Sequence, residues 1–219
     1  NKGFKKREER GSKLWEVPYL PINPKDVGRS YQSIIRINSQ SGKGGVAYLM
    51  DSEFGYKLPK AMQVEFSRVI QGVTEESGSE ISSRAIWESF KSEYLEIKTP
   101  YELKHIKISM DSDSDNDAAQ EVTLVSGLLS YKGRDIKFSS EGNGPIDAFI
   151  KGLNSTLSEP VKLKSYDEHN IDGGSDSSAV SYISLRQEKG SVKYGVGTDS
   201  NISMASIKAI VSALNRLSQ

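Results

Sequence analysis

The second half of this 219-residue chain repeats one pattern twice, and no other feature of the sequence constrains the fold as much. Each copy runs from a short apolar stretch through a polar loop to a longer apolar run, a lysine-glycine turn, another short apolar stretch and an amphipathic segment. Short apolar runs between turn residues predict strands, and apolar spacings of three and four residues predict a helix. We therefore expect two strand-strand-strand-helix (βββα) units, at about 101–158 and 159–219.

Matched positions support the duplication. The turns at 132–133 and 189–190 correspond, and we align 136–138 with 192–194 directly after them. The helical segments agree in chemical kind at Ala148, Phe149, Leu153 and Asn154 in the first copy and Ala209, Ile210, Leu214 and Asn215 in the second. Because two copies of one unit can frame a pocket where they meet, their seam is a candidate ligand site.

The residues before the duplication predict a smaller subdomain of mixed α/β type. Prolines at 18, 21 and 24 hold the chain extended, because proline fixes its own φ and restricts the residue before it. Trp15 and Tyr19 in this segment have little local structure to bury them, so we expect them to project onto another surface. Further along we expect strands at 34–38 and 46–50 around a glycine turn at 41–45, then helices beginning at Pro59 and running over about 82–95.

The predicted fold class is α+β. A small α/β linker subdomain over 1–97 is followed by a domain of two βββα units over 98–219. The chain opens on a charged amphipathic stretch without an initiating methionine, so we expect it to be part of a longer protein.

Composition narrows the classes of function. Lys plus Arg number 29 and Asp plus Glu number 29, and this zero net charge argues against a broad basic surface for nucleic acid or an anionic membrane. No apolar run approaches the roughly 18 residues of a membrane-spanning helix. The absence of cysteine excludes disulfides and thiolate metal ligands. With only His105 and His169 for imidazole chemistry, the sequence favours a binding or regulatory module over a self-contained hydrolase or metalloenzyme.

Two glycine-containing segments are candidate anion sites. The turn at 41–45 fails as a phosphate loop, because Ile37 replaces the first glycine and Gly44 replaces the magnesium-binding hydroxyl. It is a hairpin turn or a contact of Lys43 with an anionic group. The segment 142–145 is the stronger signal, because its glycines let backbone N–H groups converge where a proline begins a helix, which suits a carboxylate. An ordinary strand-to-helix turn is the simpler interpretation of these residues alone.

Long stretches of the chain resemble the 2-isopropylmalate synthase family. The stretches that resemble the segment after that family's catalytic barrel are 15–29, 35–48, 58–59 and 63–67. The turn at 142–145 and the closing helix at 202–216 resemble the family's leucine-sensing C-terminal domain. These stretches are spread along nearly the whole chain, from residue 15 to residue 216.

The resemblance implies that the parent protein is a homodimeric acyltransferase that condenses acetyl-CoA with 3-methyl-2-oxobutanoate. This reaction belongs to leucine biosynthesis, which is part of branched-chain amino acid biosynthesis. Its catalytic barrel, with a divalent metal, would lie upstream of Asn1, and the present chain would have no cofactor and no activity by itself. This part would bind L-leucine for allosteric feedback inhibition and would mediate dimerisation. A cytoplasmic location is expected, with neither nucleic acid nor membrane as a partner.

The resemblance also implies individual roles. Tyr19 would act as a catalytic residue on the partner subunit's barrel. The leucine pocket would have one wall of Gly142, Asn143, Gly144, Pro145, Ile146 and Asp147, and another of Asn170, Ser177 and Ile202. The glycine turn would hold the leucine carboxylate, Asp147 or backbone carbonyls the ammonium group, and Ile146 with Ile202 the side chain. Family members often carry alanine where Asn170 and Ser177 stand, which changes the expected pocket size.

Two alternative functions stay open at this point. The chain could be the regulatory domain of a citramalate synthase-like enzyme, which senses isoleucine with a similar fold, or a dimerisation module that binds no effector. The stretch at 15–46 favours the leucine enzyme.

Overall fold

The computed structural model describes residues 11, 22–28, 43–77, 81–111, 122–171, 177–188 and 190–219. The chain forms two compact units, 1–35 and 36–219. In the first unit the structure describes the short 3₁₀ helix η1 (Pro24–Val27). Trp15, Tyr19 and the strand expected at 34–38 lie outside the described residues.

The described linker part of the second unit is helical. Its elements are α2 (Lys43–Phe54), α3 (Lys60–Ser77), α4 (Ser83–Phe90) and η2 (Lys91–Leu95), a π-helical continuation of α4. The helices predicted after Pro59 and over 82–95 are confirmed. Ser82 begins α4, because its hydroxyl accepts a hydrogen bond from Ala85 N at 3.2 Å. None of the described helices is long and apolar enough to span a membrane.

The strand predicted at 46–50 is wrong, because α2 begins at Lys43 and continues through it. The described part of the glycine turn predicted at 41–45, residues 43–45, is likewise helical. Val46, Leu49 and Met50 are all buried, and their spacing of three and four residues places them on one face of a helix. A short apolar run looks the same in a buried strand and a buried helix, and the adjacent glycines suggested a turn. In the part that the structure describes, the linker is therefore α-helical rather than α/β.

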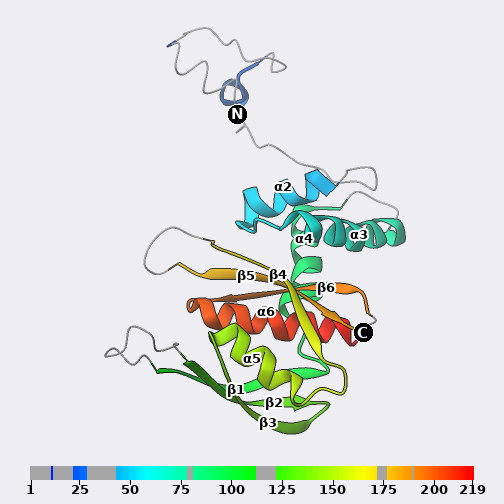
Figure 1. The fold of residues 1–219 in the computed structure, drawn as a ribbon. Helices are drawn as coiled ribbons and strands as arrows, with labels where there is room; N and C mark the ends of the chain where they lie inside the picture. The colour runs from blue at the N-terminus through cyan, green and yellow to red at the C-terminus, as the bar shows by residue number, and fades with distance from the viewer. Residues whose placement is uncertain are drawn as a thin grey trace. The chain divides into compact units, whose positions relative to one another are not determined.

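The two predicted βββα units are present, and the α+β class is confirmed (Figure 1). Each unit has three antiparallel strands in sequential order followed by a helix. The first consists of β1 (Tyr101–Asp111), β2 (Val122–Tyr131), β3 (Arg134–Gly142) and α5 (Pro145–Asn154), and the second of β4 (Val161–Asn170), β5 (Ala179–Gln187), β6 (Val192–Asp199) and α6 (Ile202–Leu217).

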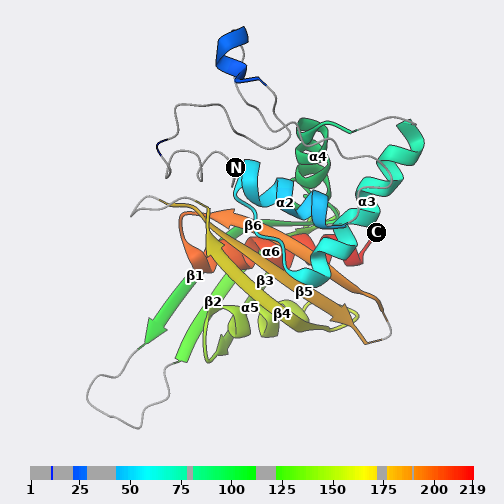
Figure 2. The ribbon, with the colours of Figure 1, turned by 90° about the horizontal axis from the view of Figure 1, so that it is seen from above.

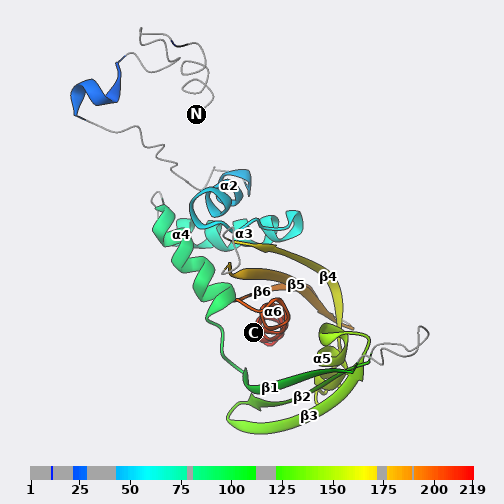
Figure 3. The ribbon, with the colours of Figure 1, turned by 90° about the vertical axis from the view of Figure 1, so that its left-hand side faces the viewer.

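Both helices lie between the two sheets, which Figure 3 shows with α6 seen end-on. Helices α2 and α3 lie on the opposite side of the second sheet from α6, as Figures 1 and 3 show, and in the view from above they lie in front of that sheet (Figure 2). The second sheet is therefore covered on both faces, and β5 is buried at every position from Ala179 to Leu185. One apolar core joins the repeats, and it includes Leu129, Phe149, Ile183, Ile210 and Leu214.

The pairing of the strands corrects the alignment of the repeats. Both first strands carry a bulge at the equivalent point, and the residue before it pairs with a leucine of the second strand, Leu129 in β2 and Leu185 in β5. Leu129 pairs with Ile136, whereas Leu185 pairs with Lys193. The structural match of Ile136 is therefore Lys193 and not Val192. The alignment from sequence is wrong by one residue, because the turn between β5 and β6 is longer than that between β2 and β3.

The helix of each repeat closes on the first strand of the other repeat through an asparagine. Asn154 of α5 donates through Nδ2 to Val161 O at 3.0 Å and accepts from Val161 N at 2.9 Å. Asn215 of α6 makes the same two bonds with Tyr101, at 2.8 and 2.7 Å. These two asparagines are the pair aligned from the sequence, and their reciprocal bonding relates the repeats by an approximate twofold axis.

Candidate effector site

The direction of the strands brings the predicted effector residues to one end of the two-repeat domain. In a sheet of three sequential antiparallel strands, the first strand ends where the second begins and the third ends. Asn170 ends β4, Ser177 precedes β5 and Ile202 begins α6 just after β6, so these residues share one end of the second repeat. The turn at 142–147 has the equivalent place in the first repeat. In Figure 1 both α5 and α6 begin at the left-hand end of the domain.

The turn between β3 and α5 is tightly built. A Cβ at Gly142 would lie 2.5 Å from Ala148 N, so no larger residue fits there without movement of the backbone. Asp147 closes the turn by accepting a hydrogen bond from Asn143 N at 3.1 Å, and it pairs with Lys151 Nζ at 2.7 Å. The hydrogen bond from Lys151 lowers the pKa of Asp147, so this carboxylate is ionised at neutral pH.

The two helix starts differ in a way that bears on anion binding. At α6 the side chain of Asn201 accepts a hydrogen bond from Met204 N at 3.1 Å, so the helix supplies its own cap. At α5 the capping position is Gly144, and no side chain of the described residues caps the first turn. The backbone N–H groups at the start of α5 therefore keep their partial positive charge for another partner.

A hollow of about 710 Å³ lies beside the uncapped start of α5. Residues 143–147, which include five of the predicted effector residues, line it together with Ile150 and the first residues of β4. Its apolar walls include Ile146, Ile150 and Leu163. N–H donors beside an apolar wall suit a small ligand that has a carboxylate and an aliphatic side chain.

The other predicted effector residues do not line this hollow. Gly142 is the last residue of β3, and Asn170, Ser177 and Ile202 lie at the same end of the domain without contributing to the walls of the hollow. Ile202 is 46% exposed at the start of α6. A smaller hollow of about 360 Å³ lies next to Ile202, between the first turn of α6 and the inner face of β1.

The β4 residues near this seam were not predicted from the sequence. Leu163 lines the larger hollow, and it lies on the same face of β4 as Tyr166. Tyr166 accepts a hydrogen bond from Ser206 Oγ of α6 at 3.3 Å and hydrogen-bonds Glu168. The alternation of Val161 and Leu163 was a usable signal, but the identity of their neighbours required the fold.

His169 is partly buried where the second sheet meets the linker. Its ring stacks on Tyr182 with 5.6 Å between centroids. Its Nε2 lies 3.0 Å from Gly55 O, in the connection between α2 and α3. The residue therefore joins β4 to the linker helices.

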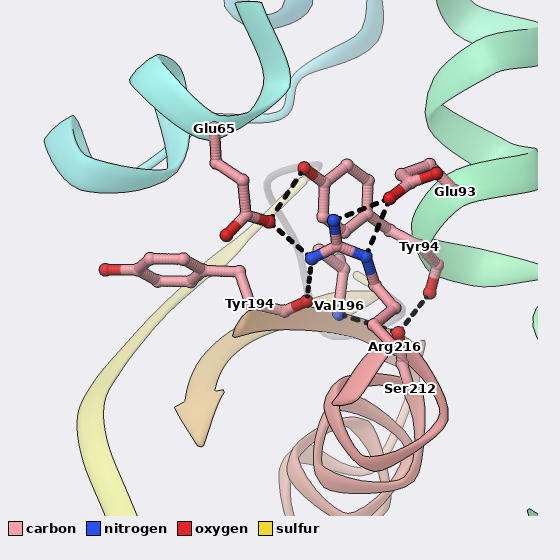
Figure 4. Close-up of polar contacts among 7 residues, drawn as sticks. All are labelled: Glu65, Glu93, Tyr94, Tyr194, Val196, Ser212 and Arg216. Carbon is pink, nitrogen blue, oxygen red and sulfur yellow. Dashed lines mark hydrogen bonds and ion pairs between the residues drawn. The ribbon is translucent and has the colours of Figure 1, made fainter. Parts of the chain in front are cut away.

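The far end of α6 is bonded to the linker helices through Arg216, which is only 4% exposed (Figure 4). Its Nη1 pairs with Glu65 of α3 and donates to Tyr194 O of β6 at 2.5 Å. Its Nε and Nη2 donate to Glu93 Oε1 of η2, at 2.9 and 2.5 Å. The guanidinium lies 4.3 Å from the centre of the Tyr94 ring.

The surroundings of Arg216 keep it charged. Burial by itself lowers the pKa of this guanidinium, but Tyr94 and the two glutamates raise it by more. Burial also raises the pKa of Tyr94, so its hydroxyl stays protonated and donates to Glu65 Oε1 at 3.1 Å. The guanidinium of Arg216, the hydroxyl of Tyr94 and the carboxylates of Glu65 and Glu93 are therefore each paired with a group from another element.

Within the described ranges, no group of three or more His, Asp or Glu side chains is arranged to hold a metal ion.

Two protein-family models match this chain, one over the duplicated domain and one over the segment before it. Residues 80–218 match the model of the LeuA allosteric (dimerisation) domain, and residues 1–51 match the alpha-isopropylmalate synthase post-catalytic domain-like model.

Curated relatives named 2-isopropylmalate synthase match almost the whole chain. The protein of Clostridium acetobutylicum is 46% identical over 98% of this chain, and that of Rhodospirillum rubrum is 41% identical over 100%. The protein of Pseudomonas entomophila is 44% identical over 98%. The chain spans only 38% of the length of the first two relatives and 36% of the third. The chain therefore belongs to the 2-isopropylmalate synthase family, of which it represents the post-catalytic region and the allosteric (dimerisation) domain.

Proposed function

We propose that this chain is the L-leucine-binding part of a 2-isopropylmalate synthase, and that leucine binds in the hollow at the start of α5. The observation that carries the proposal is the uncapped helix start beside an apolar wall. The second helix of the duplication caps its own start with Asn201, so the two equivalent positions are not equally able to take a carboxylate.

The described residues can meet each chemical need of a free amino acid. The leucine carboxylate would accept hydrogen bonds from the N–H groups of Ile146 and Asp147, at the start of α5. The side chain of Asp147 is 38% exposed and ionised, so it can accept from the ammonium group. Ile150 and Leu163 would contact the isobutyl group. The family resemblance assigns Asn170, Ser177 and Ile202 to a second wall of the leucine pocket, whereas in this chain they lie at the same end of the domain and do not line the hollow.

The relatives' name and the chain's partial coverage of them support a larger proposal. The parent would be an acyltransferase that condenses acetyl-CoA with 3-methyl-2-oxobutanoate in leucine biosynthesis, with the metal and the reacting groups in an upstream barrel. This part would form the homodimer and inhibit the reaction when leucine is abundant. Tyr19 would reach the partner subunit's barrel, and this chain alone would be inactive. The cytoplasmic location stays a prediction.

Titration calorimetry with a matched pair of variants tests the leucine site. Gly144 has an extended backbone, with φ at 174°, and a Cβ there would meet nothing within 4 Å. Gly144→Ala should therefore fold and bind leucine like the unchanged chain. Gly144→Asp places a carboxylate at the helix start, where it would occupy the N–H groups and repel the ligand. We expect the binding heat to be lost in Gly144→Asp alone.

Three results would count against this proposal. Equal leucine affinity in the two variants would show that the carboxylate does not bind at the start of α5. Tighter binding of isoleucine than of leucine in a competition titration would favour the citramalate synthase-like alternative. If leucine gave no binding heat with the unchanged chain, the alternative of a dimerisation module that binds no effector would be favoured.

A further inference from the structure

We infer that α6 transmits occupancy of the effector hollow to the linker helices, through the side chains of its last two turns. The inference rests on the proposed leucine site. The first turn of α6 lies at the effector end of the domain, and its last turns hold η2 and α3 (Figures 1 and 4). At about 1.5 Å per residue, the 16-residue helix spans roughly 24 Å between the two ends.

The contact between α6 and the linker consists of directional bonds. Ser212 Oγ donates to Tyr94 O at 2.6 Å, and Asn215 Nδ2 donates to Ile97 O at 3.1 Å. Arg216 adds its pairs with Glu65 and Glu93. Because these groups are buried or partly buried, breaking the bonds without new partners is costly. A shift of α6 must therefore move η2 and α3 or lose these bonds.

The helix cannot shift by itself, because it is seated directly on the backbone of β6. A Cβ at Gly195 would lie 2.2 Å from Ala209 O, and one at Gly197 would lie 2.0 Å from Ala205 O. These glycines let the helix and strand backbones approach more closely than any side chain would allow. Close packing of this kind transmits displacement along the whole helix, so α6 and β6 behave as one rigid body.

Three side chains of α6 form hydrogen bonds with the free edge of β6, and only two of the three also bond to the linker. Lys208 donates to Thr198 O at 3.3 Å, Ser212 accepts from Val196 N at 3.4 Å, and Arg216 donates to Tyr194 O at 2.5 Å. All three residues bind the edge at four-residue spacing. Ser212 and Arg216 also reach the linker, whereas Lys208 bonds only to residues 198 and 199 among those described. Lys208 is therefore a natural control.

The effector hollow reaches α6 through the shared core. Ile146 and Ile150 line the hollow and also pack against the core that contains Ile207 and Ile210 of α6. Leucine packed on Ile146 and Ile150 would restrict their rotamers, and this restriction would act on α6 through the core that these residues share. The end of α5 differs from the end of α6 in this respect, because Asn154 bonds to Val161 within the two-repeat domain and not to the linker helices.

Hydrogen exchange measured by mass spectrometry, with and without L-leucine, tests the inference on the 219-residue chain. In the unchanged chain we expect leucine to slow exchange at 142–150, next to the ligand, and also at 83–97, at the far end of α6. In Glu93→Gln and Arg216→Lys, the slowing at 83–97 should be lost while the slowing at 142–150 remains. Lys208→Met should keep both effects. Glu93 is 29% exposed, so its variant gives a readout even if Arg216→Lys does not fold.

The outcomes separate this inference from the proposed function. Slowing at 142–150 without any at 83–97 in the unchanged chain would overturn the transmission and leave leucine binding intact. If leucine still slowed exchange at 83–97 in both Glu93→Gln and Arg216→Lys, the transmission through α6 would be overturned as well. No leucine effect at either place, together with no binding heat, would refute the leucine site, and the inference would fall with it.

Discussion

At the scale of single residues, Arg216 shows how one buried charge can join three elements. It is bonded to α3, η2 and β6 while its own backbone belongs to α6. Buried ion pairs often add little net stability over apolar contacts of the same shape, but removal of one partner leaves uncompensated charge. Glu65 and Glu93 would be left in that condition without Arg216.

The first prediction therefore concerns Arg216→Met, which keeps an aliphatic side chain and removes the charge. We expect the free energy of unfolding to fall by about 3–5 kcal/mol, the usual cost of breaking a buried pair. Urea denaturation followed by circular dichroism measures it. Lys208→Met is the control: its ion pair with Asp199 is about half exposed, so the loss should stay below about 1 kcal/mol. Equal losses in the two variants would show that the buried pair contributes nothing special.

Single residues also differ in how well the sequence predicts their role, as the turn at 142–145 and the ion pairs of Arg216 show. The turn at 142–145 was recognisable, because two glycines and a proline at a strand-to-helix boundary have few structural uses. Nothing in the sequence pairs Arg216 with Glu65 and Glu93, since these residues are far apart along the chain and charged residues are usually solvated.

At the scale of elements, the contact of α6 with β6 depends on glycine. Gly197 faces the helix so closely that its Cβ would lie 2.0 Å from Ala205 O and 2.5 Å from Ala209 N. Both of these atoms belong to the backbone of a buried helix, so a side chain at 197 cannot be accommodated by rotamer changes alone.

We accordingly predict that Gly197→Ala pushes α6 away from β6 and lowers the free energy of unfolding by about 1–3 kcal/mol, a typical cost of overpacking. The melting temperature should fall in the same variant. Gly144→Ala adds the same methyl group where nothing lies within 4 Å, so its melting temperature should be unchanged. A Gly197→Ala chain as stable as the Gly144→Ala chain would contradict the close seating of the helix.

The elements also show how far periodicity can be used. The helices after Pro59 and over 82–95 were predictable, because they have long stripes of apolar residues at helical spacing. The α2 segment was misread as a strand, because its apolar run is too short to distinguish the two periods. The third strands were aligned one residue out of register, because only the pairing partners define equivalence in a sheet.

At the scale of the whole molecule, the linker helices and the two repeats share buried surface within one compact unit, 36–219. The domain boundary that the sequence suggested, near residue 97, stays a prediction. Tyr182 on β5 is fully buried, and its ring stacks on His169 beside the connection between α2 and α3. The repeats therefore use the linker helices to cover the outer face of the second sheet.

We predict that a chain beginning at residue 98 is less stable than one beginning at residue 43, although both contain the two repeats. The shorter chain lacks the partners of Arg216 and Ser212 and exposes the outer face of β5. Urea denaturation of the two chains measures the difference. Equal stability would instead establish 98–219 as a domain that folds independently of the linker.

By itself the sequence determined the duplication, the α+β class and the family, because these depend on residues that are neighbours along the chain. It also indicated the turn at 142–145 as a candidate anion site, although an ordinary turn was the simpler interpretation, and the family resemblance extended that candidate site to Asp147. Only the tertiary structure decided that α5 and not α6 has an uncapped start, that Leu163 faces it across a hollow, and that Arg216 joins the repeats to the linker. These features depend on which distant residues meet, and that is settled by the path of the whole chain.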